Sequence, residues 1–104
     1  MSPIVRVTLF KIPDSAVVQQ AVQKYNTLAQ DAQKDSKPYI QLSAGHALHS
    51  DPRSKGFTFL ARTVFLSRED MAYYDEKCEA HGAIKTLLKG KVEDGPPVVC
   101  VMDG

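Results

Sequence analysis

Hydrophobic and polar residues alternate along the chain in a pattern that predicts β-strands. Residues 4–10 and 39–49 alternate most clearly, while residues 57–66 are rich in Phe, Thr, Val and Leu and contain no Gly or Pro. Residues 98–102 form a short apolar run, which predicts a buried strand. Gly45 lies inside the second of these stretches, and a glycine there indicates a bulge or a close approach of another backbone.

Two segments between these strands have the period of amphipathic α-helices. In residues 18–32 the apolar side chains recur at steps of three and four, which predicts a helix of about five turns. The second helix is expected to begin after Ser67, whose hydroxyl can accept a hydrogen bond from the amide of Asp70. We expect this helix to break near His81, where Gly82 weakens it, and then to resume.

The order of elements is strand, helix, strand, strand, helix, strand, which predicts an α+β, ferredoxin-like βαββαβ fold. In that fold both helices cover one face of a four-stranded antiparallel sheet. Both faces of residues 57–66 are largely apolar, so the face without helices should be covered as well. We therefore predict a two-fold homodimer whose sheets pack face to face, with residues 1–104 as a single domain.

Composition and charge give no reason to expect nucleic acid or a membrane as a partner. The chain has 104 residues, 43% hydrophobic and 24% charged, with a net charge of +1. This balance gives no electrostatic reason to expect nucleic acid or a membrane as a partner, and no apolar run approaches the ~20 residues that span a bilayer. Cys78 and Cys100 are too few for a disulfide framework, so we interpret them as reduced residues of a cytoplasmic protein.

His81, Tyr74 and Arg6 are the candidate catalytic residues. His81 follows Tyr74 by seven positions, so in a helix the two side chains can share a face, and an imidazole titrates near neutral pH. Arg6 can bind a carboxylate or stabilise a developing oxyanion. The alternatives are structural: His81 can anchor the helix break through a hydrogen bond, and Arg6 can form a salt bridge at the sheet.

Aromatic residues of the central unit are candidates for lining an apolar pocket between the sheet and the helices, where small ligands commonly bind. They are Phe57, Phe59, Phe65 and Tyr73. Ordinary packing in the core is the alternative for each of them.

The sequence gives no reason to expect a metal or a cofactor. His46 and His49 are three positions apart, which places them on opposite faces of a strand. A basic stretch late in the second helix contains Lys85, Lys89 and Lys91, and we interpret it as a solvated face near the negative end of the helix dipole.

Several short motifs, in order and at consistent spacing, resemble those of the stress-responsive A/B barrel (Dabb) family. They are VTLFK at residues 7–11, Gly45, KGFT at residues 55–58, SRED at residues 67–70 and YYDEKCEAH at residues 73–81. The resemblance covers nearly the whole chain. It implies a small dimeric α/β-barrel protein.

The resemblance also suggests a chemistry. Some family members are polyketide cyclases that need no cofactor and transfer protons with a first-strand histidine, a helical histidine and a nearby tyrosine. Arg6 stands at the first of these positions here, whereas His81 and Tyr74 match the other two. The chain departs from the family pattern again at Phe59, where a histidine is common, and at Cys78-Glu79, where Asp-Pro is common.

These observations favour a small homodimeric Dabb-type protein that binds a small apolar or aromatic ligand between sheet and helices. The alternative is a cofactor-independent cyclase or lyase that acts on an aromatic or polyketide-like substrate with His81 and Tyr74 as acid and base groups. A cofactor-free oxygenase is a third hypothesis, which rests on analogy of fold alone.

Overall fold

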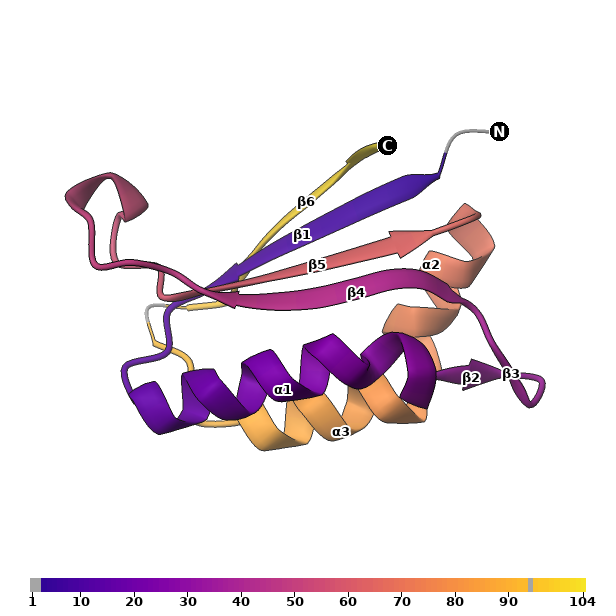
Figure 1. Ribbon diagram of the computed structural model, residues 1–104, viewed down its shortest axis with the longest axis horizontal. Coiled ribbons are helices and arrows are strands. Elements are labelled where there is room, and N and C mark those ends of the chain that lie inside the picture. The colour runs from indigo at the N-terminus through magenta and orange to yellow at the C-terminus, as the bar shows by residue number, and fades with distance from the viewer. Residues whose placement is uncertain (1–2, 94) are drawn as a thin grey trace.

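The computed structural model describes residues 3–93 and 95–104, and its centre is a four-stranded antiparallel sheet (Figure 1). The strands are β1 (Ile4–Phe10), β4 (Ile40–Ala47), β5 (Phe59–Phe65) and β6 (Val98–Asp103). They pair in the order β4-β5-β1-β6. With two helical crossovers, this order is that of the ferredoxin-like α+β fold, as the sequence predicts.

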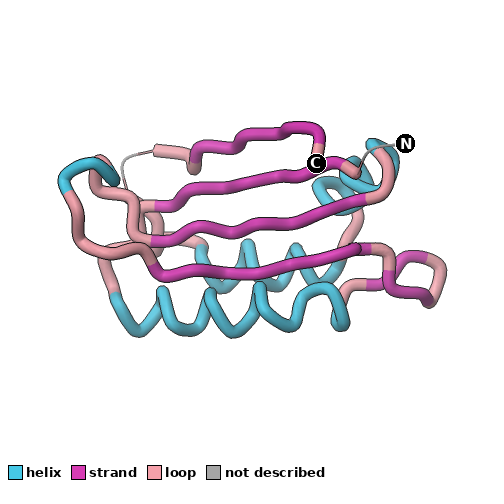
Figure 2. The backbone as a smooth tube through the Cα atoms, turned by 45° about the horizontal axis from the view of Figure 1, so that its top comes forward, coloured by secondary structure: helices cyan, strands magenta, loops and turns pink. Residues whose placement is uncertain are grey.

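Within the described part of the chain, three α-helices accompany this sheet: α1 (Ser15–Asp31), α2 (Arg68–Glu76) and α3 (Glu79–Leu88). Helices α1 and α3 lie side by side on one face of the sheet, while α2 lies near one end of it (Figures 1 and 2). The connections contain a small hairpin of β2 (Gln33–Lys34) and β3 (Lys37–Pro38) and a short 3₁₀ helix, Pro52–Ser54. The sequence pattern did not predict these short elements.

Helix α1 forms because a polar cap precedes a regular apolar stripe. Asp14 accepts a hydrogen bond from the amide of Ala16 at 2.9 Å, which satisfies one of the free amides at the start of the helix. The stripe is buried against the sheet, where Ala21, Tyr25 and Leu28 are almost inaccessible to solvent. Burial of this stripe, rather than intrinsic propensity, supplies most of the stability of such a helix.

Gly45 is approached closely by the side chains of Phe59 and Tyr25, and not by another backbone as expected. A Cβ atom at this position would lie 2.9 Å from Cζ of Phe59 and 3.1 Å from Cβ of Tyr25. The amide of Gly45 also donates to the side-chain oxygen of Asn26 at 3.0 Å, which ties α1 to β4. The irregularity in this strand lies elsewhere, between Ile40 and Leu42.

The second helical segment breaks near His81, as expected, but at Lys77 and Cys78 rather than at Gly82. Helix α2 ends at Glu76, and the amides of Lys77 and Cys78 both donate to the carbonyl oxygen of Tyr73, at 2.8 and 3.0 Å. Cys78 then has an extended backbone (φ −71°, ψ 116°), and α3 begins at the next residue. Gly82 remains helical. The break therefore places His81 in the first turn of α3.

Strand β6 is present as predicted, but it is more exposed than the sequence indicates. It was expected to be a buried strand, but all of its residues are exposed. The reason is its position: β6 pairs only with β1 at one edge of the sheet.

Residues on the sheet face opposite the helices, called here the outer face, are mainly apolar. Arg62 and His46 also lie on it, and strand register places the following apolar side chains and one thiol there: Val5, Val7, Leu9, Leu42, Ala44, Leu60, Val64, Val98, Cys100 and Met102. Val98 and Met102 are 43% and 44% exposed. Cys100 is a free, exposed thiol on this face, whereas Cys78 is a free thiol in the core.

Candidate functional site

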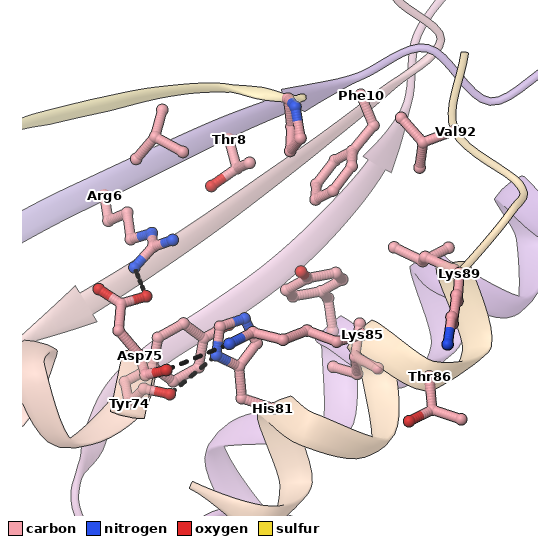
Figure 3. Close-up of a pocket in the computed structure, with 15 residues that line it drawn as sticks. Arg6, Thr8, Phe10, Tyr74, Asp75, His81, Lys85, Thr86, Lys89 and Val92 are labelled. Atoms are coloured by element: carbon pink, nitrogen blue, oxygen red, sulfur yellow. Dashed lines mark hydrogen bonds and ion pairs between the residues drawn. The ribbon is translucent and has the colours of Figure 1, made fainter. Parts of the chain in front are cut away.

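A cavity of about 480 Å³ lies between the inner face of the sheet and the helices (Figure 3). Its sheet side consists of alternate residues of β1, namely Arg6, Thr8 and Phe10, because alternate side chains of a strand share a face. Val99 of the neighbouring strand β6 continues this wall. The volume is in the range of small-molecule sites in proteins.

The helical side of the cavity carries both polar and apolar groups. It is lined by Tyr25, Tyr74, Asp75, His81, Ile84, Lys85, Thr86, Leu88 and Lys89, and two loop residues, Val92 and Pro97, complete it. The ion pair of Arg6 and Asp75 lies at one end, called here the polar end, whereas Phe10, Val92 and Lys89 lie toward the other end (Figure 3). The cavity is therefore suited to a molecule with a polar end and an apolar body.

Tyr74 and His81 form the centre of the polar end. Their rings are stacked, with centroids 3.7 Å apart and an angle of 9° between the planes. Nδ1 of His81 lies 2.8 Å from the main-chain carbonyl oxygen of Tyr74. Because a carbonyl oxygen can only accept, Nδ1 carries the proton, and in the neutral ring the lone pair is on Nε2.

The imidazole of His81 is held in its neutral form. Burial lowers its pKa from 6.5 to about 4, and the positive charges of Lys85 and Arg6 act in the same direction. The hydrogen bond to the carbonyl of Tyr74 and the charge of Asp75 act in the opposite direction but are weaker. The position of His81 in the first turn of α3, at the positive end of a helix dipole, also disfavours the imidazolium form.

Arg6 forms an ion pair with Asp75, which joins β1 to the end of α2. Its guanidinium carbon also lies 5.4 Å from the ring centroid of Tyr74, within the range of a cation–π contact. The salt bridge expected for Arg6 is therefore present. The same side chain lines the cavity, so its structural role does not remove it from the candidate site.

Tyr25 belongs to this cavity, although the sequence pattern did not single it out. Burial raises the pKa of its phenol to about 12, and hydrogen bonding with Tyr74 offsets part of that effect. Burial likewise raises the pKa of Tyr74. Both phenols are therefore neutral hydrogen-bonding groups. Tyr25 lies on the apolar stripe of α1, and the pattern of that stripe does not distinguish a cavity residue from a core residue.

The aromatic residues expected to bind a ligand do not line this cavity. Phe59 and Phe65 are fully buried beneath it, and they support its wall through ring contacts with Tyr25 (5.5 Å) and Tyr74 (5.1 Å) respectively. Phe57 packs against the side chain of Lys11.

Tyr73 faces a different part of the surface. Its hydroxyl donates to the carbonyl oxygen of Gln33 at 3.3 Å, and its ring makes an edge contact with Tyr39 at 5.2 Å. The structure thus brings together Arg6, Tyr74 and His81 of the predicted site, and it leaves the four predicted ligand-binding aromatics outside the cavity.

No group of three or more His, Cys, Asp or Glu side chains among the described residues is arranged to hold a metal ion. No helix among the same residues is long and apolar enough to cross a membrane.

Fold and cavity together define a class: small ferredoxin-like α+β domains with a ligand-sized cavity between sheet and helices. Within that class, the sequence model of the stress responsive A/B barrel domain (Dabb) family matches residues 4–101, and the chain belongs to this family. The resemblance seen in the sequence motifs is confirmed.

One relative is similar in sequence over most of this chain. A fusaristatin A biosynthesis cluster protein of Gibberella zeae is 38% identical over 90 residues, which cover 86% of this chain and 65% of the relative. The chain thus spans somewhat less than two thirds of that relative's length.

Solved structures are similar in fold at low sequence identity. A dimeric protein of unknown function and ferredoxin-like fold from Bacteroides fragilis has a TM-score of 0.79 at 14% identity, over 100% of this chain and 98% of the other. The hydroxynitrile lyase of Passiflora edulis has a TM-score of 0.74 at 13% identity, over 98% and 93% of the two chains. At these identities the likeness concerns the fold alone.

Proposed function

We propose that the protein is a homodimer and that each subunit binds a small, largely apolar molecule in the cavity between sheet and helices. The observation that carries the binding function is the cavity itself, about 480 Å³ in volume, with the ion pair of Arg6 and Asp75 at one end. An apolar wall with a few polar groups in fixed positions is the usual form of a small-molecule site. The ligand class is an apolar or aromatic compound.

A cavity-filling variant tests ligand binding. Val99 lines the cavity and Val101 lies two residues further along the same face of β6 without lining it. A set of aromatic and alkyl-aromatic compounds is screened by thermal shift and calorimetry. Val99→Trp should abolish the binding that the wild type and Val101→Trp show. Binding that survives in Val99→Trp places the ligand elsewhere, and a wild type that binds none of the compounds contradicts the proposal.

The homodimer is supported by the apolar outer face and by the dimeric ferredoxin-like proteins among the structural neighbours. An exposed apolar surface of this kind usually forms an interface. A light-scattering mass near the 11.5 kDa of one chain at micromolar concentration would contradict it. Cytoplasmic location, which the free thiols of Cys78 and Cys100 favour, stays a prediction.

The position of His81 in the cavity, beside Tyr74 and Arg6, supports a second candidate function, proton transfer without a cofactor on an aromatic or polyketide-like substrate. A neutral imidazole with its lone pair on Nε2 can accept a proton from an acidic C–H group, and Arg6 can stabilise the resulting oxyanion. The biosynthesis-cluster relative is consistent with such a role.

Hydrogen–deuterium exchange tests this candidate. A 1,3-diketone with an aromatic substituent is incubated with the protein in deuterated buffer, and exchange at its acidic carbon is followed by NMR. In His81→Gln the protein-dependent rate of exchange should fall about 10²-fold or more. His49→Gln, which changes an exposed histidine, should keep the wild-type rate. Equal rates in wild type and His81→Gln would leave only the binding function.

A further inference from the structure

Charged side chains around the cavity are unevenly balanced. Arg6, Lys85 and Lys89 line it, and Asp75 is the single carboxylate among the lining residues. His81 is neutral because its pKa is lowered to about 4. The lining therefore has two more positive than negative charges, although the whole chain has a net charge of only +1.

These cations differ in how their charge is compensated. The guanidinium of Arg6 is paired with the carboxylate of Asp75. Nζ of Lys85, in contrast, donates to the main-chain carbonyl oxygen of Asp75 at 3.1 Å, and that oxygen carries no formal charge. Among the described carboxylates none forms an ion pair with Lys85.

The hydrogen bond also fixes where the charge of Lys85 lies. It draws the ammonium group from α3 across to the end of α2, beside Tyr74, Asp75 and His81 (Figure 3). The effect of Lys85 on the pKa of His81 is consistent with this placement. Lys85 is exposed, as the sequence suggests, and its hydrogen bond keeps the ammonium group at the polar end of the cavity.

We infer that the polar end of the cavity is an anion site, and that Lys85 selects ligands whose apolar body carries a carboxylate. This inference rests on the proposed ligand-binding function and adds the chemical class of the ligand. Lys85 offers an uncompensated charge at the site, and charge-assisted hydrogen bonds to a carboxylate are stronger than those to a neutral amide. Asp75 acts as an internal competitor, because its carboxylate occupies Arg6 in the free protein.

A matched pair of probes isolates the charge of the ligand. para-Hexylbenzoate and para-hexylbenzamide have nearly the same shape, and they differ in charge at neutral pH. Their dissociation constants are measured by calorimetry at low ionic strength, where electrostatic attraction is least screened. The wild type should bind the benzoate about tenfold more tightly than the benzamide.

Two pairs of variants then assign the selectivity to residues. Lys85→Met should lower the benzoate preference about fivefold and leave benzamide binding unchanged, whereas Lys91→Met, an exposed lysine outside the cavity, should change neither. Asp75→Asn should raise the benzoate preference about threefold because it frees Arg6, while the neighbouring Glu76→Gln should not. Thermal unfolding of each variant shows that it is folded.

The possible results separate this inference from the function on which it rests. Equal affinity of the wild type for both probes overturns the anion site while ligand binding stands. A preference that persists in Lys85→Met overturns the role of Lys85. Failure of both probes to bind contradicts the anion site and, if the wider compound set also fails, the proposed binding function as well.

Discussion

The imidazole of His81 lies parallel to the phenol ring of Tyr74 at a centroid distance of 3.7 Å, although the two residues belong to different helices. An unbroken helix would place residues seven positions apart about two turns, or ~10 Å, from each other along the axis. The break at Lys77 and Cys78 turns the chain back, and this brings the rings together. The contact therefore depends on the break and not on helical periodicity.

Protonation of His81 should couple the stability of the fold to pH. Its pKa is lowered from 6.5 to about 4 in the folded chain, so between these values the unfolded state binds more protons. Above pH ~6.5 the ionisation of His81 costs the folded state nothing. As pH falls from 6.5 toward 4, protonation of this side chain in the unfolded state lowers the free energy of unfolding. We expect the wild type to lose about 2 to 3 kcal/mol over this window relative to His81→Gln.

Urea denaturation at a series of pH values measures this difference. His49→Gln serves as the control, since His49 is exposed, follows β4 and does not line the cavity. Its stability should follow that of the wild type at every pH. Parallel curves for wild type and His81→Gln would show that the imidazole of His81 is not held neutral by the fold.

Two glycines should respond to alanine in opposite directions. Gly45→Ala places a methyl group 2.9 Å from Cζ of Phe59, inside a packed layer, and should cost about 1 to 3 kcal/mol. At Gly82 a Cβ would meet nothing within 4 Å and the residue is helical, so Gly82→Ala should stabilise by about 0.5 to 1 kcal/mol.

Chemical denaturation of the two variants in parallel measures both effects. The Gly82 result also examines the position of the helix break. A destabilised Gly82→Ala variant would mean that Gly82 serves as the flexible point of the segment, as its sequence context suggests.

Alternation and composition of apolar residues were enough to predict the four long strands, because β1, β4 and β5 contain side chains buried against the helices and β6 is an apolar run. Ser67 was also recognised correctly as a helix cap, and it accepts from the amide of Asp70 at 3.1 Å. The exposure of β6 could not be predicted, since a strand covered by helices and a strand covered by another chain have the same apolar sequence pattern.

The site was predicted less completely than the fold. Arg6, Tyr74 and His81 stand out in the sequence because they are polar or titratable residues, and because they lie at the positions of the family's catalytic residues. Tyr25 and Lys85 do not, since one lies in an apolar helical stripe and the other in a basic surface stretch. Their roles depend on the angle at which α1 and α3 cross the sheet, and local sequence does not specify that angle.

The proposed dimer interface can be tested by substitutions at two positions of β6 that lie on opposite faces of the sheet. Val98 lies on the outer face and Val101 on the inner face, and both are similarly exposed in one chain, at 43% and 46%. Val98→Glu should dissociate the dimer, because a carboxylate buried in an apolar interface is strongly unfavourable. Val101→Glu should leave it intact.

Analytical ultracentrifugation of both variants reports the oligomeric state directly. Dissociation by Val101→Glu, with Val98→Glu remaining dimeric, would place the interface on the opposite side of β6. A dimer unaffected by Val98→Glu and by an equivalent change at Leu42 would exclude the outer face.

The turn between β2 and β3 offers a simple gain in stability. Asp35 and Ser36 both have positive φ angles, 53° and 65°, as in a type I′ turn, where glycine is favoured at the second position. Ser36→Gly should therefore stabilise the chain by about 0.5 to 1 kcal/mol, whereas Ser36→Ala should not. Thermal unfolding compares the two, and equal melting temperatures would contradict the strain assigned to Ser36.

A bound anion should change the titration of His81. Lys85 and Arg6 lower the pKa of this imidazole, so a carboxylate that lies against them adds a charge of opposite effect and raises the pKa toward its ordinary value. NMR of the imidazole nitrogens can follow this titration with para-hexylbenzoate present, with para-hexylbenzamide present and without ligand. The benzoate alone should move the titration to higher pH, and Lys85→Met should move it in the same direction without any ligand. An unchanged titration in the presence of bound benzoate would mean that the carboxylate lies away from His81, and the anion site would then have to be placed at Lys89, at the other end of the cavity.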